Sequence, residues 1–206
     1  MAGLNDPVAA SEERWAKAER YARGYADNGM GEALRIYYTR YLPAGVLLVI
    51  IVIIIINSVL FPDEPDRWRS TTQAGVFVFA FSALIGGLIY NAKRLRPRVE
   101  LGSDLSIMFP LEKEEQKAIR RGITGKEPVP DNHLTVARAV AVQSRKSEAT
   151  ILLVIPGYTY FLGQAAGSLD WVYLLLFAGL VGMVILQARN FWRQGRFLAA
   201  TAPDTT

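Results

Sequence analysis

The residues of this chain that could carry out chemistry are few and scattered. His133 is the only histidine, and cysteine is absent. A chain without cysteine forms no disulfide, zinc–thiolate site or iron–sulfur cluster and offers no thiol nucleophile. His133 has no further ligands nearby at metal-binding spacing. We therefore interpret it as a solvated polar residue beside the start of a helix, and we expect no metal and no cofactor.

Acidic residues form two small groups. Glu112, Glu114 and Glu115 lie early in a predicted helix. They could serve as a metal or acid–base group, but carboxylates in a first turn are typical of favourable interaction with the helix dipole. The acidic turn at residues 63–66 could bind a divalent cation weakly, and a solvated turn is the favoured interpretation.

Other signatures of chemistry are missing from the sequence. Neither Gly86-Gly87 nor Gly122/Gly125 precedes the Lys-Ser/Thr pair of a phosphate-binding loop. The interiors of the long apolar stretches contain no Asp, Glu, Lys, Arg or His, which usually mark ion paths and proton relays in membranes. The sequence therefore predicts neither an enzyme nor a proton-coupled transporter.

The surrounding chain is divided into apolar blocks and charged segments. Hydrophobic residues make up 51% of the 206 residues, and charged residues 20%. The apolar ones gather at residues 42–61, 72–91, 149–167 and 170–187. A bilayer-crossing helix needs ~20 residues, and a soluble domain would spread its apolar residues instead. We predict an all-α membrane protein with four transmembrane helices arranged as two hairpins. The third block is the weakest candidate for a transmembrane helix, because Pro156 interrupts it.

Basic residues predict the orientation of these helices. If the chain alternates sides, the segments on one side hold 21 of the 23 Lys and Arg residues and those on the other hold two. The positive-inside rule then places residues 1–41, 92–148 and 188–206 in the cytoplasm of a bacterial plasma membrane. The expected order is a segment 1–41, a hairpin 42–91, a helical module 92–148, a hairpin 149–188 and a tail 189–206. Because these basic residues flank the membrane and mix with Glu, nucleic-acid binding is disfavoured.

The N-terminal segment predicts an amphipathic helix at residues 11–25, with Ser11 as N-cap. Trp15, Tyr21 and Tyr25 share one face of this helix, and basic residues flank them. Such a helix can lie in the lipid headgroup layer. Packing of the aromatic stripe on the module at 92–148 is the alternative, and the lipid surface is slightly favoured.

The module opens directly after the second block with a basic cluster. This cluster could attract anionic headgroups, although an ordinary membrane anchor is the favoured interpretation. It consists of Lys93, Arg94, Arg96 and Arg98.

Two short helices are predicted within the module. The first covers residues 111–121, with Pro110 in its first turn and Gly122 as the residue that ends it. The second begins near Asn132 and continues towards the third block. Both are too small to form a stable core alone.

The stretch FPLEKEEQKAIRRGITGKEPVPDNHLTVARAVAV, residues 109–142, resembles a motif in small, uncharacterised four-span membrane proteins of actinobacteria. In that motif an acidic helix ends in Arg-Arg-Gly, and a Pro-Val-Pro-Asp turn leads into an Ala/Val-rich helix entering the membrane. The resemblance implies a membrane location and no particular activity. The matching residues are Arg120, Arg121, Gly122, Pro128, Val129, Pro130 and Asp131.

Small residues four apart indicate close helix packing, either internal or with another membrane protein. We predict a non-catalytic accessory or assembly subunit of a larger membrane complex, in contact with the bilayer and with other membrane subunits. A small transporter or channel, a lipid-transport accessory protein and a membrane enzyme acting on lipid are the alternatives. The small residues are Ser82 with Gly86, Ala83 with Gly87, Gly163 with Gly167, and Ala178 with Gly182.

Overall fold

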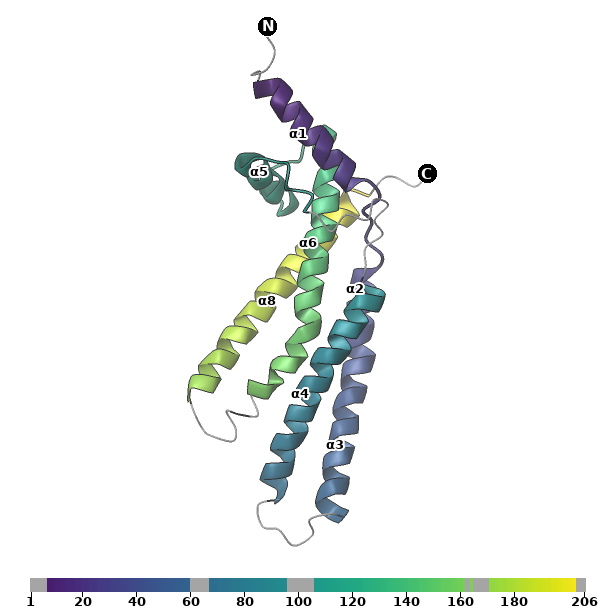
Figure 1. Cartoon of the computed structure of the whole chain (residues 1–206), viewed down its shortest axis with the longest axis vertical. Coiled ribbons are helices and arrows are strands. Elements are labelled where there is room, and N and C mark those ends of the chain that lie inside the picture. The colour runs from purple at the N-terminus through teal and green to yellow at the C-terminus, as the bar shows by residue number, and fades with distance from the viewer. Residues whose placement is uncertain (1–6, 60–66, 96–105, 162–163, 165–170, 203–206) are drawn as a thin grey trace. The chain divides into compact units, whose positions relative to one another are not determined.

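The computed structural model describes residues 7–59, 67–95, 106–161, 164 and 171–202 (Figure 1). The chain divides into two compact units. We call Met1–Asn28, Arg96–Ser147 and Arg189–Thr206 the polar unit, and Gly29–Leu95 and Glu148–Ala188 the apolar unit. Within the described ranges the regular structure is helical, and no β-strand occurs.

Three helices are long and apolar enough to cross a membrane, and they cover three of the four predicted blocks. They run over Met30–Val59, Trp68–Arg94 and Trp171–Ala200. The first comprises α2 (Met30–Ile36), the π-helical turn η1 (Tyr37–Tyr41) and α3 (Leu42–Val59), the second is α4 (Arg67–Arg94), and the third is α8 (Trp171–Ala200).

The block at 149–167 is not among these three helices. It begins inside α6 (Leu134–Val154) and continues in the 3₁₀ turn η3 (Ile155–Tyr158). Pro156 lacks the N–H that a helix needs and its ring clashes with the preceding turn, which explains why the α-helix stops there. The helical residues 159–161 follow, and most of 162–170 lies outside the described residues.

The π-helical turn lies directly before Pro43. The N–H of Leu42 donates to the carbonyl of Tyr37, five residues back. In a regular α-helix the ring of Pro43 would clash with the carbonyl of Thr39. The wider turn accommodates the proline without ending the helix, and it sets the direction of the tyrosines at 37, 38 and 41.

Glycines allow the helices of the apolar unit to approach closely. The helices α3 and α4 lie side by side (Figure 1), and a Cβ added at Gly75 would overlap the side chain of Ile53. A Cβ at Gly87 would overlap the backbone carbonyl of Leu153 on α6. A Cβ at Gly157 would lie 2.9 Å from the Cβ of Leu84. Each contact depends on the missing side chain.

The polar unit has its own hydrophobic core. It is formed by α1 (Pro7–Ala22), α5 (Lys113–Ile123) and the first part of α6. Helix α1 begins before the predicted start, so Ser11 lies inside it and is no N-cap. It ends at Ala22, and Gly24 follows with φ 75°, so Tyr25 lies beyond the helix. The most buried residues of this core are Ala18, Ile107, Val136, Ala137, Ala139, Val140 and Ala141.

Helix α5 also differs in its ends from the prediction. Glu112 is its N-cap, and the N–H of Glu112 donates to the carboxylate of Glu115 at 2.8 Å, so Pro110 precedes the helix. Gly122 lies within the helix, and Gly125, with φ 73°, is the left-handed residue after it. A Cβ on Gly122 would overlap the side chain of Val129, so this glycine permits a close contact and does not end the helix.

The second predicted helix of the module is confirmed. A short turn η2 (Asp131–His133) leads into α6, which begins at Leu134 and continues to Val154. Helix α6 therefore begins in the polar unit and ends in the apolar unit, whereas α8 begins in the apolar unit and ends in the polar unit.

Candidate functional site

The predicted aromatic stripe of the N-terminal segment lies against protein. Trp15, Tyr21 and Tyr25 are partly buried and pack on the core of the polar unit. The indole of Trp15 stacks on the imidazole of His133, with centroids 3.5 Å apart and planes inclined by 18°. The stripe therefore packs on protein, which was the less favoured of the two expectations.

His133 differs from its interpretation as a solvated residue. Its Nδ1 is buried and has no hydrogen-bond partner in the described part of the chain. Burial lowers the pKa of His133, and the negative charges of Glu19 and Glu115 oppose this effect. The ring is therefore held neutral against Trp15.

An ion-pair network joins α1 to the start of α5. The guanidinium of Arg14 lies 3.1 Å from a carboxylate oxygen of Glu115 and 3.2 Å from one of Glu112. The hydroxyl of Ser11 donates to Glu115 at 2.9 Å. Burial acts to raise the pKa of Glu115, but hydrogen bonds from Arg14, the Glu112 N–H and Ser11 hold it below its usual range. These carboxylates therefore tie α1 to α5. They lie at the N-terminus of a helix, as the sequence indicated, and they also form ion pairs with Arg14, which the sequence did not indicate.

A second cluster surrounds Arg145 on α6. Its Nη1 pairs with Asp27, and its guanidinium lies 4.4 Å from the ring centroid of Phe191 on α8. A Cβ added at Gly195 would lie 3.0 Å from the same guanidinium. The Arg145 side chain is 12% exposed. Sequence reasoning missed this residue, although it lies four residues from the buried Ala141 and Ala149 and therefore on a buried helix face.

A cavity of about 390 Å³ adjoins this cluster and is lined by Arg138 and Arg145. Two arginines in one cavity would suit an anion, but each has a partner within the protein. Arg145 pairs with Asp27, and Arg138 donates to the backbone carbonyl of Thr201. These pairings make the cluster a clamp that ties α6 to the segment after α1 and to Thr201 directly after α8, and both guanidinium groups are already engaged.

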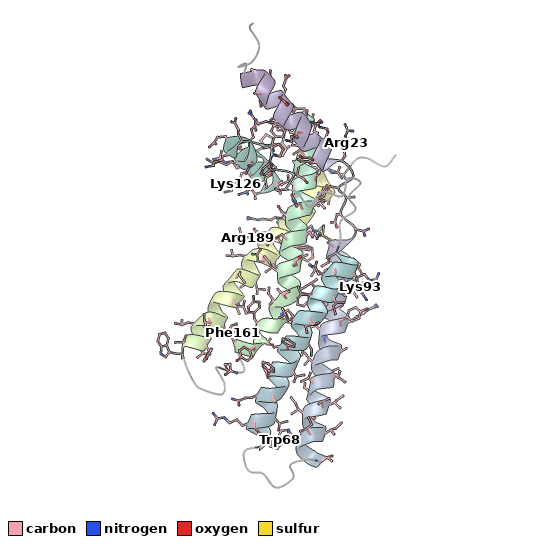
Figure 2. All side chains as sticks on the ribbon, viewed as in Figure 1. Arg23, Trp68, Lys93, Lys126, Phe161 and Arg189 are labelled. Carbon is pink, nitrogen blue, oxygen red and sulfur yellow. The ribbon has the colours of Figure 1, made fainter. Side chains whose placement is uncertain are left out.

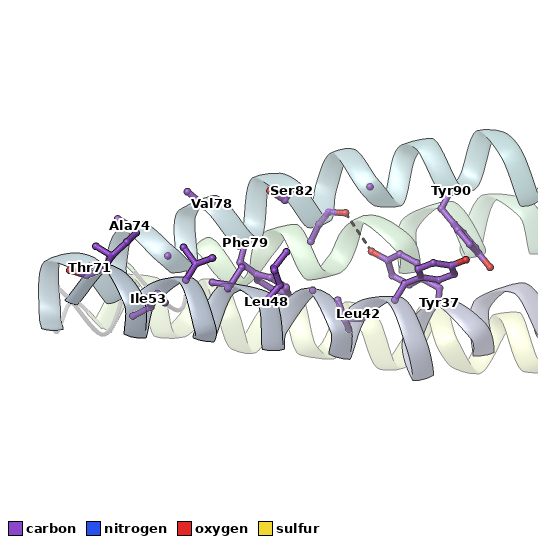
Figure 3. Close-up of a pocket in the computed structure, with 18 residues that line it drawn as sticks. Tyr37, Leu42, Leu48, Ile53, Thr71, Ala74, Val78, Phe79, Ser82 and Tyr90 are labelled. Atoms are coloured by element: carbon purple, nitrogen blue, oxygen red, sulfur yellow. Dashed lines mark hydrogen bonds between the residues drawn. The ribbon is translucent and has the colours of Figure 1, made fainter. Parts of the chain in front are cut away.

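The apolar unit contains a groove of about 430 Å³ between α3 and α4 (Figure 3). Its walls are mostly apolar, and small residues widen it on the α4 side. At one end it is bordered by aromatic rings from η1 and α4, and at the other it reaches Thr71. The residues that shape its middle are Gly45, Leu48, Val49, Val78, Ser82 and Gly86.

Tyrosines form the aromatic end of this groove. The ring of Tyr90 lies 5.4 Å from that of Tyr37 and 5.5 Å from that of Tyr41. The hydroxyl of Tyr37 donates to the carbonyl of Ala83 at 3.4 Å, as Figure 3 shows, and that of Tyr90 donates to the carbonyl of Ala33 at 2.9 Å. Tyr38 points elsewhere and donates to the carbonyl of Leu152. Hydrogen bonds thus fix three of the four rings.

The predicted small-residue positions fall into three classes. Gly87 packs against the backbone of α6, whereas Ser82, Ala83 and Gly86 line the groove. Gly182 on α8, like its neighbour Gly179, has no described atom within 4 Å of the position that a Cβ would take. The pair Gly163 and Gly167 lies outside the described residues.

The predicted basic cluster is described only in part. Lys93 and Arg94 are exposed at the end of α4, and Lys93 lies at the opposite end of that helix from Trp68 (Figure 2). Arg96, Arg98 and the acidic turn at 63–66 lie outside the described residues. Over the rest of the chain, no group of three or more His, Asp or Glu side chains is placed to hold a metal ion.

Comparisons with models of protein families, with curated proteins and with solved structures give no match to this chain.

Proposed function

We propose that the protein is a multi-pass protein of a bacterial plasma membrane with four transmembrane helices in two hairpins. Both termini and residues 92–148 are cytoplasmic in this proposal. The distribution of 21 and two basic residues supports it. So does the course of the chain, because α6 leaves the polar unit for the apolar unit and α8 returns to the polar unit.

Within that membrane the protein acts as a non-catalytic accessory or assembly subunit of a larger complex. The observation that carries this proposal is the uncovered face of α8. Gly179 and Gly182 have no described atom near their missing side chains. Leu175 and Leu186, on the same face one turn away on each side, are both 60% exposed.

Small residues on an uncovered helix face suit another helix better than lipid. Area burial does not drive helix association in a bilayer, because lipid tails are as apolar as leucine. Close approach at glycine lets backbones and flanking side chains gain dispersion contacts that disordered lipid tails supply less well. The face around Gly179 and Gly182, framed by leucines, is therefore a suitable contact for a partner's transmembrane helix.

The polar unit supports the same role. Its charged side chains near the core, Arg14, Glu115, Arg145 and Asp27, are engaged with one another. Charged groups that pair with one another stabilise the packing of the helices. A reactive centre would need at least one such group free to contact a substrate.

Recovery of a partner from membranes of the native host in gentle detergent tests this function. We expect a larger membrane protein at near-equal stoichiometry, and we expect Gly182→Leu to reduce its recovery about tenfold, or ~1.4 kcal/mol. Gly86→Leu is the matched control, since it makes the same substitution at another open position. Equal recovery with both variants, or solute transport by the protein alone in liposomes, would contradict the proposal.

A further inference from the structure

We propose that the groove between α3 and α4 binds one acyl chain of an anionic phospholipid, with its phosphate held at the tyrosine end by Arg40, Arg94 and the hydroxyl of Tyr41. The site is independent of any partner protein on α8.

The shape of the groove suits a hydrocarbon chain. Thr71 and Tyr90, which lie at its two ends, are about 28 Å apart along α4 at the ~1.5 Å rise per residue. Even when the space on its open side is added to the cavity, the total of about 1170 Å³ corresponds to a mean cross-section of about 40 Å² over that length. A helix ~10–12 Å across needs roughly 80–110 Å², so a partner helix is too wide to enter.

Small residues provide the room at the tyrosine end. Gly86 has no described atom within 4 Å of the position of a Cβ, and the nearest atom to such a position at Gly45 is a ring carbon of Phe79 at 3.9 Å. From Tyr90 to Val78 the groove extends about 18 Å along α4. One leaflet of the hydrocarbon core is ~15 Å thick, so this part accommodates one acyl chain.

The tyrosine end offers a free hydroxyl for a headgroup. Tyr37 and Tyr90 are held by their bonds to backbone carbonyls. Tyr41 is 56% exposed, and its hydroxyl makes no hydrogen bond within the described ranges. The π-helical turn before Pro43 brings the Tyr41 ring beside Tyr90, at the mouth of the groove.

Uncompensated positive charge lies at the same end. Arg94 follows Tyr90 by four residues and so lies one helical turn further toward the end of α4. Arg40 lies between Tyr37 and Tyr41, the tyrosines that η1 contributes to this end of the groove. Both arginines are exposed, and neither pairs with a carboxylate of the described residues. Arginine binds phosphate through two parallel hydrogen bonds, so an anionic headgroup complements this end.

Native mass spectrometry tests the site. The whole chain is purified in mild detergent, stripped of lipid and offered equal amounts of phosphatidylglycerol and phosphatidylcholine with identical acyl chains. We expect one retained phosphatidylglycerol in preference to phosphatidylcholine. Gly86→Leu should reduce retention at least about fivefold because its side chain fills the groove, and Gly182→Leu, on α8, should retain lipid like the parent. Equal retention by the two leucine variants would overturn the groove as the site.

Charge variants test the headgroup contact separately. The double variant Arg40→Gln, Arg94→Gln should reduce the preference for phosphatidylglycerol about tenfold, because the choline cation of phosphatidylcholine already offsets its phosphate and its retention should fall less. The double variant Arg23→Gln, Lys126→Gln removes two exposed positive charges from the polar unit (Figure 2) and should leave the preference intact. An equal effect of both double variants would show that only net charge matters, and would contradict a headgroup site.

A photo-crosslinking side chain at Ser82 identifies the occupant in native membranes without relying on any variant of the glycines. Ser82 lines the groove. We expect an adduct with the mass of a phospholipid. An adduct with a protein would overturn the lipid assignment and would show that a polypeptide segment covers the groove.

Discussion

The polar and apolar units differ in what holds their helices together. In the polar unit, charged side chains pair over long distances in the sequence, as Arg145 on α6 does with Asp27 after α1 and Arg14 on α1 does with Glu115 on α5. In the apolar unit, the hydroxyls of Tyr37 and Tyr90 donate to backbone carbonyls, and Gly87 lets α4 approach α6. Charged side chains cost much more free energy in a bilayer than in contact with water. The difference between the units therefore agrees with the proposed position of the membrane. The two kinds of stabilisation suit the two environments that we propose for the units.

The largest effect in this comparison is expected from breaking the buried charge pair. Asp27→Ala leaves the guanidinium of Arg145 mostly buried without its carboxylate, and such a loss costs ~3–5 kcal/mol. We expect a corresponding fall in the free energy of unfolding, measured for the whole chain in detergent. Glu32→Ala, which removes an exposed pair with Arg35, is the control and should cost less than ~1 kcal/mol. Similar effects of the two variants would contradict a clamp at Arg145.

The matching perturbation in the apolar unit is Gly87→Val. Its side chain would overlap the carbonyl of Leu153, which is backbone and cannot rotate away. Overpacked sites typically lose ~1–3 kcal/mol, so the thermal midpoint should fall. Gly86→Val, one residue earlier and open, is the control. If the two variants melt alike, α4 and α6 do not depend on this contact.

Acidification should weaken the polar unit in two steps. The pKa of His133 is lowered by burial, so its contribution to stability is full above its ordinary value of ~6.5 and is lost as pH falls through the lowered value. The pKa of Glu115 is also lowered, and its contribution is lost further down, below ~4.3.

The proton NMR signal of the only histidine measures the first step directly, and Trp15 emission reports the docking of α1. His133→Gln should remove the change in emission between pH 7 and 5 and leave the one at lower pH. A histidine that titrates at or above its ordinary value would contradict the burial of the ring against Trp15.

The smallest effect is expected from Ser11→Ala. It removes one hydrogen bond to Glu115 and leaves Arg14 in place, so a cost of ~1 kcal/mol is expected. The unfolding midpoint measures it. Ser106→Ala, at an exposed position, is the comparison. A larger loss than that of Asp27→Ala would show that the Ser11 hydrogen bond stabilises the polar unit more than the buried ion pair does, which is the reverse of the expected order.

Three helices long and apolar enough to cross a membrane were predictable from the sequence, because a long stretch without charged residues is a local property. The ends of α1 and α5 were not predicted correctly. Ser11 hydrogen-bonds to Glu115, which is distant in the sequence, and Gly122 packs against Val129, which follows a turn. Neither contact is visible in the local sequence. The pairing of Arg145 depends equally on a distant residue, Asp27.

The groove illustrates the same limit for the candidate site. Gly86 was recognised as a small residue four from Ser82, a pattern that indicates close packing. In the structure it faces open space, because the π-helical turn before Pro43 and the contact of Gly75 with Ile53 set how α3 lies on α4. Spacing along one helix carries no information on whether a second helix fills the face.

The cytoplasmic location of the polar unit is the central claim, and cysteine labelling tests it most directly. The chain contains no cysteine, so Asn132→Cys introduces a single thiol at an exposed position. We expect no reaction with an impermeant maleimide in intact cells and full reaction after permeabilisation, while Asp63→Cys in the predicted outer turn reacts in intact cells. Labelling at position 132 in intact cells would contradict the cytoplasmic location of this unit.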